Sequence, residues 1–570
     1  MLTEWQFCYT PDTAIGIINH ETNIGNAEWQ TVSVPHDWAI SGDFDKEIDK
    51  QIVAIEQNGE KEATEHTGRT GSLPYIGTGC YRTTFTPHAG YQRTLLSFDG
   101  VMSQPRVYVN GEFVGGWEYG YTPFIIDITK VIRSGESNQI EVLCRNIPES
   151  ARWYPGAGIY RPITLIETHS TALAEWGTTI NTDSLSNDKA YISINTEIEG
   201  DTTNTRITFS ISDKNDNNTS YTLTQQNTSA NVELSNPKLW SPETPNLYAL
   251  TITLSKGGNV IDQKQTTFGI RTLSCTPENG FQLNGQTRKI KGVCLHHDLG
   301  MLGTALNKAA LRRQIRLLKD MGCDAIRTAH NIPSVWQMEI CDSMGMMVMA
   351  ESFDEWIYPK CKNGYHRYFS TITDNQQTWA ECDLTTLVRC HRNHPSIVMW
   401  SIGNEIPEQG SKENGAKYVR HFTDLIHSLD PDKGRLVTSG CDRIDAAVWS
   451  GFAQELDIVG MNYRTHKYQF AYDNTPQKII LGSETASTVS SRGVYKLPVV
   501  RADNQEYPDG QCSSYDQEAC WWSNIPENDF ELQDDKPWVI GEFVWTGYDY
   551  LGEPTPYDGY WPSRSSYFGI

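Results

Sequence analysis

The sequence predicts a multidomain protein in which an N-terminal jelly-roll β-sandwich and an immunoglobulin-like β-sandwich precede a (β/α)₈ TIM barrel. Three observations predict this order. The 570-residue chain is too long for one ordinary domain. Its first half consists of short β-type runs separated by turn residues. Its second half alternates apolar strands with helical stretches. We place the domains at residues 1–168, 169–274 and 275–570.

The first segment has an all-β pattern. Runs such as Thr94–Phe98 and Ile140–Cys144 are separated by Gly, Pro and Asp. Asn110-Gly111 directly follows Arg106–Val109 and precedes another β-type run, which is the strongest short hairpin signal. We expect a jelly-roll sandwich here, with the polar segment Gln51–Thr67 as a long surface loop.

The second segment also reads as β structure. Alternating runs include Arg206–Ser212 and Leu247–Leu254, and a domain of about 100 residues with this spacing is typical of an immunoglobulin-like sandwich. Its richness in Ser, Thr and Asn indicates solvated faces, and we find no chemistry in it.

The third segment has the rhythm of a barrel, with helical stretches such as Lys308–Met321 between its strands. Eight strand candidates can be counted, which is the number that closes a (β/α)₈ barrel. They are Lys289–Leu295, Ala325–Ala329, Met346–Ala350, Ser396–Ser401, Arg435–Ser439, Asp457–Met461, Lys478–Leu481 and Trp538–Val544. Because the chain stops at Ile570, where an eighth helix would begin, we expect a barrel truncated at its C-terminal end and a further carboxyl-terminal part.

Titratable or aromatic residues follow seven of these strands at their carboxyl ends, where barrel enzymes place their active sites. Each has a structural explanation when taken alone, such as a loop histidine with satisfied hydrogen bonds. Seven such strand ends on one face of the barrel favour an active site. The residues are His296-His297, His330, Glu351, Asn404-Glu405, Tyr463, Glu484 and Trp545.

Two of these residues form a candidate carboxyl pair. Glu405 follows the fourth strand and Glu484 the seventh, so they can face each other across the barrel mouth. Two carboxyls in one mouth, one of them in a more apolar pocket, separate into a protonated acid and an ionised nucleophile, as glycoside hydrolysis requires. For Glu405 alone, a helix cap or a surface ion pair remains the structural alternative.

Several motifs resemble glycoside hydrolase family 2, which includes β-galactosidases and β-glucuronidases. His391–Ser396 together with Trp400–Glu405 resembles the acid/base signature of the family. Arg152–Arg161 resembles its first-domain signature, and Pro35–Trp38 its entrance motif. The likeness covers nearly the whole chain and includes the order of the domains.

This resemblance implies a retaining exo-acting β-glycosidase with Glu405 as acid/base and Glu484 as nucleophile. The rival nucleophile is Glu542, and we favour Glu484 because Glu542 falls inside the eighth strand, upstream of its tip. We expect Glu405 to be the protonated member, held near Trp400 and Asn404. The resemblance gives substrate-binding roles to Asn404 (the sugar 2-OH), Tyr463 (a hydrogen bond to the nucleophile), His296 and His330 (the −1 sugar) and Trp545 (an aromatic platform), with His297 as a neighbour.

The sequence departs from the family pattern at its metal sites. Met102 and Arg152 stand where family galactosidases carry an Asn and an Asp, which argues against a sodium site. Glu355 matches one magnesium ligand, but Ile357 stands where a His is needed. We therefore expect no required cofactor and no metal. We assign Arg152 to substrate binding, with a modified or algal galactan oligosaccharide as an alternative substrate that it would serve.

Specificity depends on the end of the chain. β-Glucuronidases of the family have an Asn-x-Lys clamp where Ser566-Tyr567-Phe568 offers no cation, so we expect a β-galactosidase that removes terminal β-galactosyl residues from oligosaccharides. The alternatives are a β-glucuronidase, a β-mannosidase or a non-catalytic carbohydrate-binding protein. Asn363–Phe369 is either an ordinary barrel loop or a contact for neighbouring sugar units.

Charge and composition limit the partners. The net charge of −23 argues against nucleic acid and anionic membranes, because binding a polyanion needs basic patches. The sequence contains no run of about 18 apolar residues, so it predicts no membrane span. Thirteen irregularly spaced cysteines indicate free, packed thiols. A homo-oligomer is one open alternative, and the compartment is either cytoplasmic or, with a signal removed, periplasmic.

Overall fold

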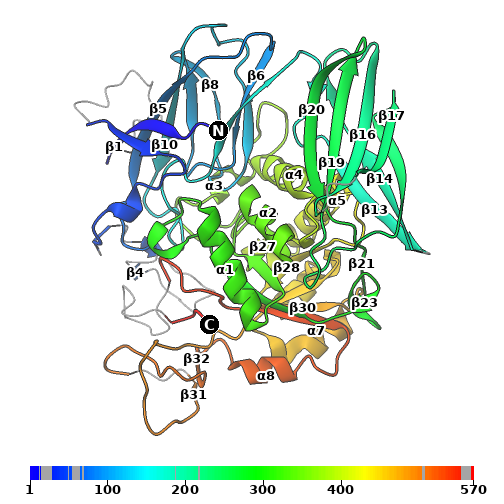
Figure 1. The fold of residues 1–570 in the computed structure, drawn as a ribbon. Coiled ribbons are helices and arrows are strands. Elements are labelled where there is room, and N and C mark those ends of the chain that lie inside the picture. The colour runs from blue at the N-terminus through cyan, green and yellow to red at the C-terminus, as the bar shows by residue number, and fades with distance from the viewer. Residues whose placement is uncertain are drawn as a thin grey trace.

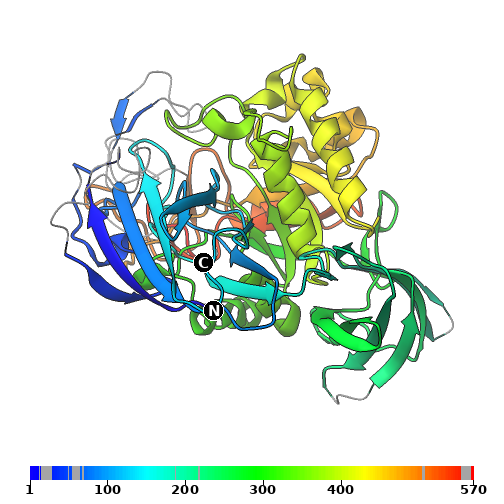
Figure 2. The ribbon, with the colours of Figure 1, turned by 90° about the horizontal axis from the view of Figure 1, so that it is seen from above.

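The computed structural model describes residues 1–570 except 12, 14–27, 46, 49–50, 54–63, 67–69, 187, 216–218, 504–506 and 554–566. Two β-sandwiches lie beside each other on one side of a barrel (Figures 1 and 2). This arrangement confirms the predicted fold class.

The N-terminal sandwich has a six-stranded and a three-stranded antiparallel sheet, in the orders β2-β1-β5-β10-β7-β8 and β11-β6-β9. The strands are β1 (Glu4–Thr10), β2 (Gln30–Ser33), β5 (Gly77–Phe85), β6 (Arg93–Phe98), β7 (Arg106–Val109), β8 (Glu112–Gly116), β9 (Phe124–Asp127), β10 (Asn138–Asn146) and β11 (Ile163–Thr168). Asn110 and Gly111 both have positive φ, 52° and 83°, as the predicted tight hairpin between β7 and β8 requires.

One expectation for this domain was partly wrong. The stretch predicted as a surface loop, Gln51–Thr67, contains β3 (Gln51–Val53) and β4 (Thr64–His66), which pair antiparallel. Short runs of β-forming residues inside a polar segment were too weak a signal to predict this hairpin. The rest of the stretch lies outside the described residues.

The middle sandwich packs the sheet β13-β14-β18 against the sheet β17-β16-β19-β20. Its strands are β12 (Ala172–Leu173), β13 (Thr179–Ser186), β14 (Lys189–Asn195), β15 (Ile198–Glu199), β16 (Thr205–Asp213), β17 (Thr219–Gln225), β18 (Ser229–Ser235), β19 (Tyr248–Lys256) and β20 (Asn259–Phe268). Alternation decides what is buried: on β16, Ile207, Phe209 and Ile211 are fully buried while the residues between them are partly exposed.

A small sheet of β21 (Leu273–Thr276), β22 (Gly280–Leu283) and β23 (Gln286–Thr287) leads into a closed eight-stranded parallel barrel. The barrel strands are β24 (Ile290–Leu295), β25 (Ala325–Thr328), β26 (Met347–Glu351), β27 (Ile397–Asn404), β28 (Leu436–Cys441), β29 (Val459–Asn462), β30 (Ile480–Thr485) and β33 (Val539–Val544). All eight predicted strands are therefore present, with ends that differ by up to four residues.

Helices follow the first seven barrel strands, and a short two-stranded ladder, β31 (Ala502–Asp503) with β32 (Glu518–Ala519), lies in the loop after β30. The helices are α1 (Lys308–Met321), α2 (Val335–Met344), α3 (His366–Phe369), α4 (Trp379–His391), α5 (Gly415–Leu429), α6 (Ile444–Ser450), α7 (Tyr468–Asn474) and α8 (Pro526–Glu531). The 3₁₀ turns are Ala39–Ser41, Gly300–Leu302, Pro407–Gly410, Ala453–Glu455 and Thr465–Lys467. Within the described residues after Val544 there is no helix.

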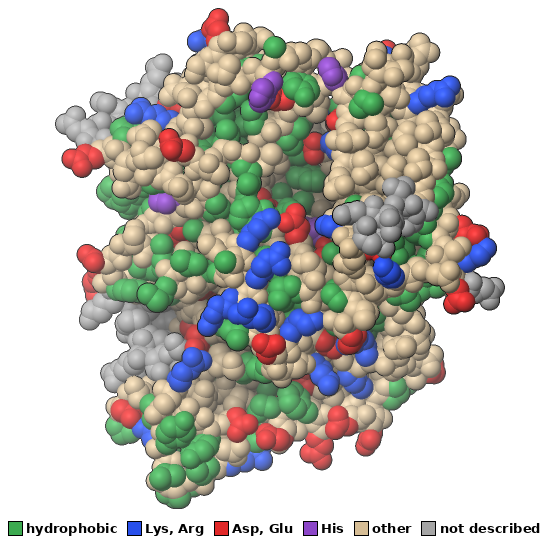
Figure 3. Space-filling model, viewed as in Figure 1, with side chains coloured by type: hydrophobic (Ala, Val, Ile, Leu, Met, Phe, Trp, Pro, Cys, Tyr) green, Lys and Arg blue, Asp and Glu red, His purple; other side chains and the backbone are tan. Residues whose placement is uncertain are grey.

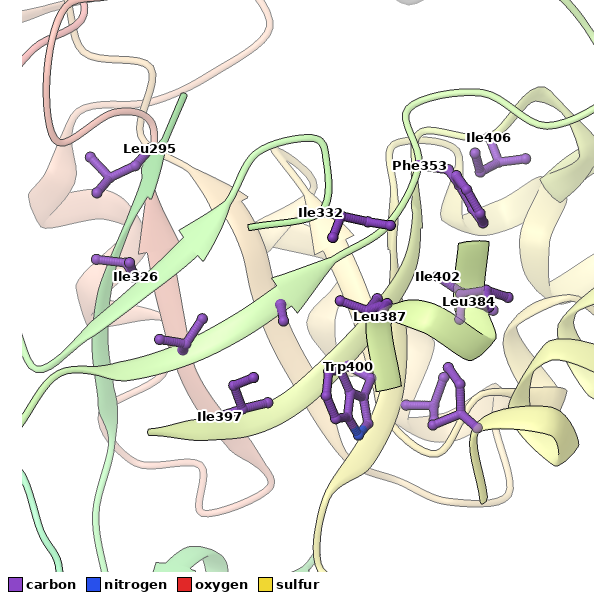
Figure 4. Close-up of a cluster of buried hydrophobic side chains, with 14 of the residues drawn as sticks. Leu295, Ile326, Ile332, Phe353, Leu384, Leu387, Ile397, Trp400, Ile402 and Ile406 are labelled. Carbon is purple, nitrogen blue, oxygen red and sulfur yellow. The ribbon is translucent and has the colours of Figure 1, made fainter. Parts of the chain in front are cut away.

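Strand β27 connects the hydrophobic core to the barrel mouth. Its eight residues are all buried, and Trp400 packs with Ile397 and with Leu384 and Leu387 of α4 (Figure 4). The Trp400 indole donates a 2.8 Å hydrogen bond to Asp430. Glu405 was expected to be held near Trp400 and Asn404, and for Trp400 this was wrong, because its side chain faces the helices rather than the barrel mouth.

The N-terminal domain docks on the barrel through buried hydrogen bonds. Trp117 Nε1 and Thr122 Oγ1 each donate to Asp383 Oδ1 of α4 at 2.7 Å, and Arg161 donates to the Ile332 carbonyl at 2.9 Å. Burial raises the pKa of Asp383 to about 7. This docking places the loop after β10 at the mouth of the barrel.

Cysteine and membrane expectations can also be checked. All thirteen cysteines are free, and none is exposed, which confirms the prediction of packed thiols. None of the helices in the described part of the chain combines the length and apolar character needed to span a membrane.

Candidate active site

A pocket opens at the carboxyl ends of the barrel strands, on the face where barrel enzymes carry their active sites. All eight residues to which the sequence analysis assigns a catalytic or substrate-binding role line it: Arg152, His296, His330, Asn404, Glu405, Tyr463, Glu484 and Trp545. Trp153, Asp442, Arg464, Ser487, Trp522, Tyr550 and Phe568 complete the lining. The N-terminal domain contributes Arg152 and Trp153, so the pocket is built by two domains.

Arg327, on β25, organises the floor of this pocket. Its guanidinium is fully buried and donates to Glu351 Oε2 at 2.9 Å, to Glu484 Oε2 at 2.8 Å and to Asn404 Oδ1 at 2.8 Å. Burial alone would raise the pKa of Glu351, but the Arg327 charge and a hydrogen bond from His330 outweigh it and lower that pKa. The carboxylates of Glu351 and Glu484 are thus held by one cation.

Glu405 has the opposite environment. Burial raises its pKa to about 8, and the negative charges of Asp442 and Glu484 act in the same direction, while Lys360 and Arg152 oppose them. Asn462 Nδ2 donates to Glu405 Oε1 at 3.1 Å and to Asn404 Oδ1 at 3.0 Å. Burial and the neighbouring charges thus favour the protonated form of Glu405, whereas Glu484 pairs with the buried Arg327 guanidinium.

The two strand ends beside the carboxyls are conformationally strained. Glu405 and Tyr463 have φ values of 45° and 54°, a left-handed conformation that costs non-glycine residues about 1 kcal/mol or more. Backbone hydrogen bonds hold both in place, from Glu405 N to Gly440 O at 2.7 Å and from Tyr463 N to Glu484 O at 2.8 Å. Such strain is common at functional sites, and here it aims both side chains into the pocket.

The hydroxyl of Tyr463 lies among polar partners. Ser487 Oγ donates to it at 2.8 Å. Burial raises the pKa of Tyr463 far above its ordinary value, and the charge of Glu484 and a hydrogen bond to Glu484 add to this effect. Tyr463 is therefore a neutral donor beside Glu484, which is the contact that the family resemblance implies.

Aromatic rings form one wall of the pocket. His330 stacks on Trp545 with ring centroids 5.4 Å apart and an angle of 5° between the planes. His296 stacks on Tyr550 at 4.0 Å and packs against Trp153 at 5.0 Å. Burial keeps the pKa of His296 well below its ordinary value, so this wall is uncharged at His296 and offers ring faces and N–H groups to a sugar.

Two residues of the pocket lining, Arg152 and Asn404, belong to an ion-pair cluster around Asp354. Arg152 donates to its two carboxylate oxygens at 2.9 and 2.8 Å, Lys360 at 3.0 Å and Asn404 Nδ2 at 3.0 Å. Burial opposes ionisation of Asp354, but the charges of Arg152 and Lys360 outweigh it and hold its pKa well below the ordinary value. Both polar ends of the Asn404 amide are thus fixed.

Other predicted strand-end residues lie outside the pocket. Glu351 is fully buried beneath it and accepts from His330 Nδ1 at 2.8 Å. His297 points away, with its Nε2 3.1 Å from the Pro155 carbonyl. Glu542 accepts from Thr485 at 2.5 Å and also from Gln533, and it is absent from the pocket lining.

Sequence reasoning missed several members of the site. Arg327 could have been found, because it is the one charged residue in a four-residue strand that is otherwise apolar or β-branched. Asp354 lies between two acids that the sequence did single out, Glu351 and Glu355. Trp522 and Tyr550 come from longer loops, where no periodicity indicates which side chains turn inward. Asp442 and Arg464 lie in two-residue links directly after β28 and β29.

The residues at the family magnesium position do not fit a metal ion. Glu355 accepts from the backbone amides of Lys360 at 2.7 Å and His366 at 3.0 Å, one on each oxygen. Ile357 supplies only a backbone amide, which donates to Glu408. Among the described residues, no group of three or more His, Cys, Asp or Glu could hold a metal.

Comparison with known families shows to which family the chain belongs. Family models described as the sugar binding domain, a further domain and the TIM barrel domain of glycosyl hydrolases family 2 match residues 2–169, 171–271 and 276–558. The chain belongs to glycosyl hydrolase family 2. It is accordingly a glycosidase, with a carbohydrate as substrate, and the recognition made from its motifs is confirmed.

Two relatives show the range of specificities in this family. Beta-galactosidase BoGH2A of Bacteroides ovatus is 33% identical over 97% of this chain and 68% of its own length. A putative beta-glucuronidase of Formosa agariphila is 32% identical over 93% of this chain, which spans only 50% of that protein. The chain thus covers between half and about two thirds of the length of these relatives.

Solved structures agree with the family 2 fold. A beta-glycosidase from Bacteroides vulgatus has a TM-score of 0.84 at 29% identity, covering 100% of this chain and 72% of that one. A glycosyl hydrolase family 2 member from Bacteroides cellulosilyticus has a TM-score of 0.78 at 31% identity, with 97% and 66% covered.

Proposed function

We propose that this family 2 glycosidase is a retaining, exo-acting β-galactosidase that removes terminal β-galactosyl residues from oligosaccharides through a covalent glycosyl-enzyme intermediate. One observation carries the proposal: Glu405, with a pKa raised to about 8, and Glu484, held by the Arg327 guanidinium at 2.8 Å, line one pocket. A protonated carboxyl beside an ionised one is the pair that the retaining reaction uses.

The reaction assigns a role to each carboxyl. Glu484 attacks the anomeric carbon as Glu405 transfers its proton to the glycosidic oxygen, which leaves with the aglycone. Water then attacks the glycosyl-enzyme ester, Glu405 accepts the proton of this water, and Glu484 is released as a carboxylate. Asn404, fixed by Arg327 and Asp354, is placed to bind the sugar 2-OH, and Tyr463 donates to Glu484.

Charge in the pocket favours a neutral sugar. Arg152, one of the two arginines in the lining, is paired with both oxygens of Asp354. Tyr567 and Phe568, at the place where glucuronidases have their clamp, bring no cation. The absence of a free basic cluster in the described lining supports a galactoside over a uronide.

A β-glucuronidase is the second candidate, on one observation. Arg464 lines the pocket, and its described contacts are two 3.4 Å hydrogen bonds to the carbonyls of Tyr463 and Trp522. No ion pair joins it to a carboxylate of the described chain. A uronic acid carboxylate could therefore pair with Arg464, although one arginine lacks the clamp of those enzymes.

Turnover of aryl β-galactoside, β-glucuronide and β-mannoside tests the specificity. We expect the galactoside to be cleaved with β-galactose as the first-formed product, observed by NMR. Glu405→Gln should lower kcat for a substrate with a poor leaving group at least about 100-fold, because general acid catalysis supplies that much or more. A 2-deoxy-2-fluorogalactosyl fluoride should label Glu484, as read by peptide mass spectrometry.

The same panel contains the contrary outcomes. A label on Glu542, with Glu484→Gln still active, would reverse the nucleophile assignment. Faster cleavage of the glucuronide would replace the galactoside by the second candidate. An α-configured first product would exclude retention, and no turnover of any substrate would favour a carbohydrate-binding protein.

A further inference from the structure

Two adjacent tryptophans at the pocket mouth differ in exposure. Trp522 lines the pocket and packs partly buried against the barrel core. Trp521 meets it edge to face, with ring centroids 5.4 Å apart and an angle of 89°, and is 48% exposed. A large indole surface therefore lies one ring away from the pocket wall, in solvent.

The backbone that carries this pair is rigidly attached to the catalytic region. Both indoles are at the centre of a tight turn closed by a 2.9 Å hydrogen bond from Ser523 N to Cys520 O. Cys520 N donates to the Ser487 carbonyl at 3.1 Å, and Ser487 N donates to Ser523 Oγ at 2.7 Å. Ser487 Oγ also bonds the Tyr463 hydroxyl, which lies beside Glu484. The turn is therefore connected to the candidate nucleophile through Ser487 and Tyr463.

Arg464 fixes the other side of the turn. Its guanidinium lies in the pocket lining and donates to the Trp522 carbonyl at 3.4 Å. Cys520 and Ser487 are both fully buried. The backbone that carries the Trp521 indole is therefore anchored in advance, which lowers the entropy cost of binding a ligand on it.

Among the described residues, the other strongly exposed tryptophan is different. Trp449, on α6, is 63% exposed, but Lys412 lies over its ring at 3.9 Å, and it is absent from the pocket lining. In the described part of the chain, no lysine or arginine covers the ring of Trp521.

We propose that the Trp521 indole is the platform on which the second sugar unit of the substrate, the one joined to the leaving oxygen, packs. The C–H face of a pyranose ring is apolar and suits an indole face, and an aromatic ring fixed in advance loses little conformational entropy on binding. This inference rests on the proposed exo-β-galactosidase function and adds the residue that binds the second sugar of the oligosaccharide.

The loop carrying the turn extends further from the barrel. Figure 3 shows hydrophobic side chains gathered at the lower left of the face, where Figure 1 places β31 and β32. Tyr495 and Tyr515, a ring pair on the same loop with centroids 5.5 Å apart, are 63% and 36% exposed. Exposed rings therefore continue along the same loop, which agrees with a substrate longer than two units.

The test compares substrates with and without a second ring. β-Galactosyl fluoride has no second sugar ring, whereas the galactosyl disaccharides and trisaccharides of the panel have one or two rings beyond the galactose. In Trp521→Ala, we expect the ratio of kcat/KM for the best oligosaccharide to kcat/KM for the fluoride to fall about 10-fold, mainly through KM. Trp521→Phe should restore most of the ratio, because it retains a ring.

Trp449→Ala is the matched control, since it removes an even more exposed indole that lies on α6, away from the lining residue Trp522, and should leave the ratio and both rates unchanged. An unchanged ratio in Trp521→Ala, or an equal fall in the control, overturns the platform. A wild-type enzyme that does not turn over the fluoride would instead refute the galactosidase function itself. If the oligomeric state changes in Trp521→Ala while the kcat/KM ratio stays the same, the indole belongs to an interface between copies of the chain. That result would overturn the platform proposal.

Discussion

Arg327 and Glu484 form a buried ion pair, with 2.8 Å between Nη1 and Oε2, on strands β25 and β30. The same guanidinium reaches Glu351 on the neighbouring strand and Asn404 on β27. The position of the candidate nucleophile and that of the candidate 2-OH donor are thus set by one side chain. We therefore treat Arg327 as a positioning residue.

Replacing Arg327 should separate positioning from stability. Arg327→Lys keeps the charge but cannot donate to Glu351, Glu484 and Asn404 in the same planar arrangement, and misplacement of a reacting group by about 1 Å can cost about 100-fold in rate. We expect kcat to fall by that order. Arg327→Met should also destabilise the protein by about 3–5 kcal/mol, because it leaves buried carboxylates unpaired.

A matched control is available at the other end of the barrel. Arg271 is equally buried and donates to the carbonyls of Pro395 and Ile397 and to Asp432. Arg271→Lys should lower the unfolding midpoint while kcat stays within about twofold of wild type. If Arg327→Lys loses only stability, as the control does, Arg327 has no role in positioning Glu484.

The pH profile should report Glu405. Burial and the charges of Asp442 and Glu484 raise its pKa to about 8, and a general acid acts only while protonated. The value of kcat/KM should therefore fall as the pH rises through about 8. Measurement on a substrate with a poor leaving group, at constant ionic strength, gives this alkaline limb directly.

Asp442 allows the cause of that limb to be tested. It accepts a 2.6 Å hydrogen bond from Gln409, which Asn in its place retains, so Asp442→Asn removes the charge and little else. With one negative neighbour fewer, the pKa of Glu405 should fall and the alkaline limb should move to lower pH. A limb that stays in place, or moves upward, would show that the limb belongs to another group.

Glu542 should affect stability rather than catalysis. Burial raises its pKa from 4.5 to about 8, so the folded state binds a proton that the unfolded state releases. Its contribution is complete below about pH 4.5 and is lost as the pH rises through 8, by at most about 1.4 kcal/mol per pH unit. Glu542→Gln removes this loss and keeps hydrogen-bonding groups toward Thr485 and Gln533.

Urea midpoints at pH 5 and pH 8 test this expectation. The variant should gain stability over wild type at pH 8 and little at pH 5, with activity retained within a few-fold. A midpoint difference independent of pH would mean that the carboxyl does not titrate in this range.

The sequence predicted the barrel and the pocket lining well, for a physical reason. Apolar parallel strands have a strong pattern, and side chains that directly follow them, such as His330 and Tyr463, must lie at one face. The predictions that failed concerned the direction in which a side chain points. The pairing register of β27 with β28 shifts between Ser401 and Asn404, so Asn404 turns inward while Trp400, an even number of residues before it, packs outward. Residues that are distant in sequence and pair only in the folded structure, such as Arg327 with Glu484, cannot be matched from their spacing in the sequence.

Arg152 and Asp354 provide the last prediction. Their two hydrogen bonds, of 2.9 and 2.8 Å, join the N-terminal domain to the barrel. Asp354→Asn leaves the cations Arg152 and Lys360 without their carboxylate, whereas Arg152→Met leaves Asp354 still paired with Lys360. The free energy of unfolding should therefore fall more in Asp354→Asn. A double-mutant cycle should give a coupling of about 1.5 kcal/mol or more.

The same variants decide what Arg152 does toward substrate. A guanidinium already bound to both oxygens of a carboxylate has little charge left for an anionic substituent, so Arg152→Met should lower kcat/KM by a similar factor for neutral galactosides and for sulfated or otherwise acidic ones. A selective loss on acidic galactans would show instead that Arg152 leaves Asp354 to bind substrate. Measuring both substrate classes in Arg152→Met and in the double variant separates the two, because only direct binding makes the loss depend on the charge of the sugar.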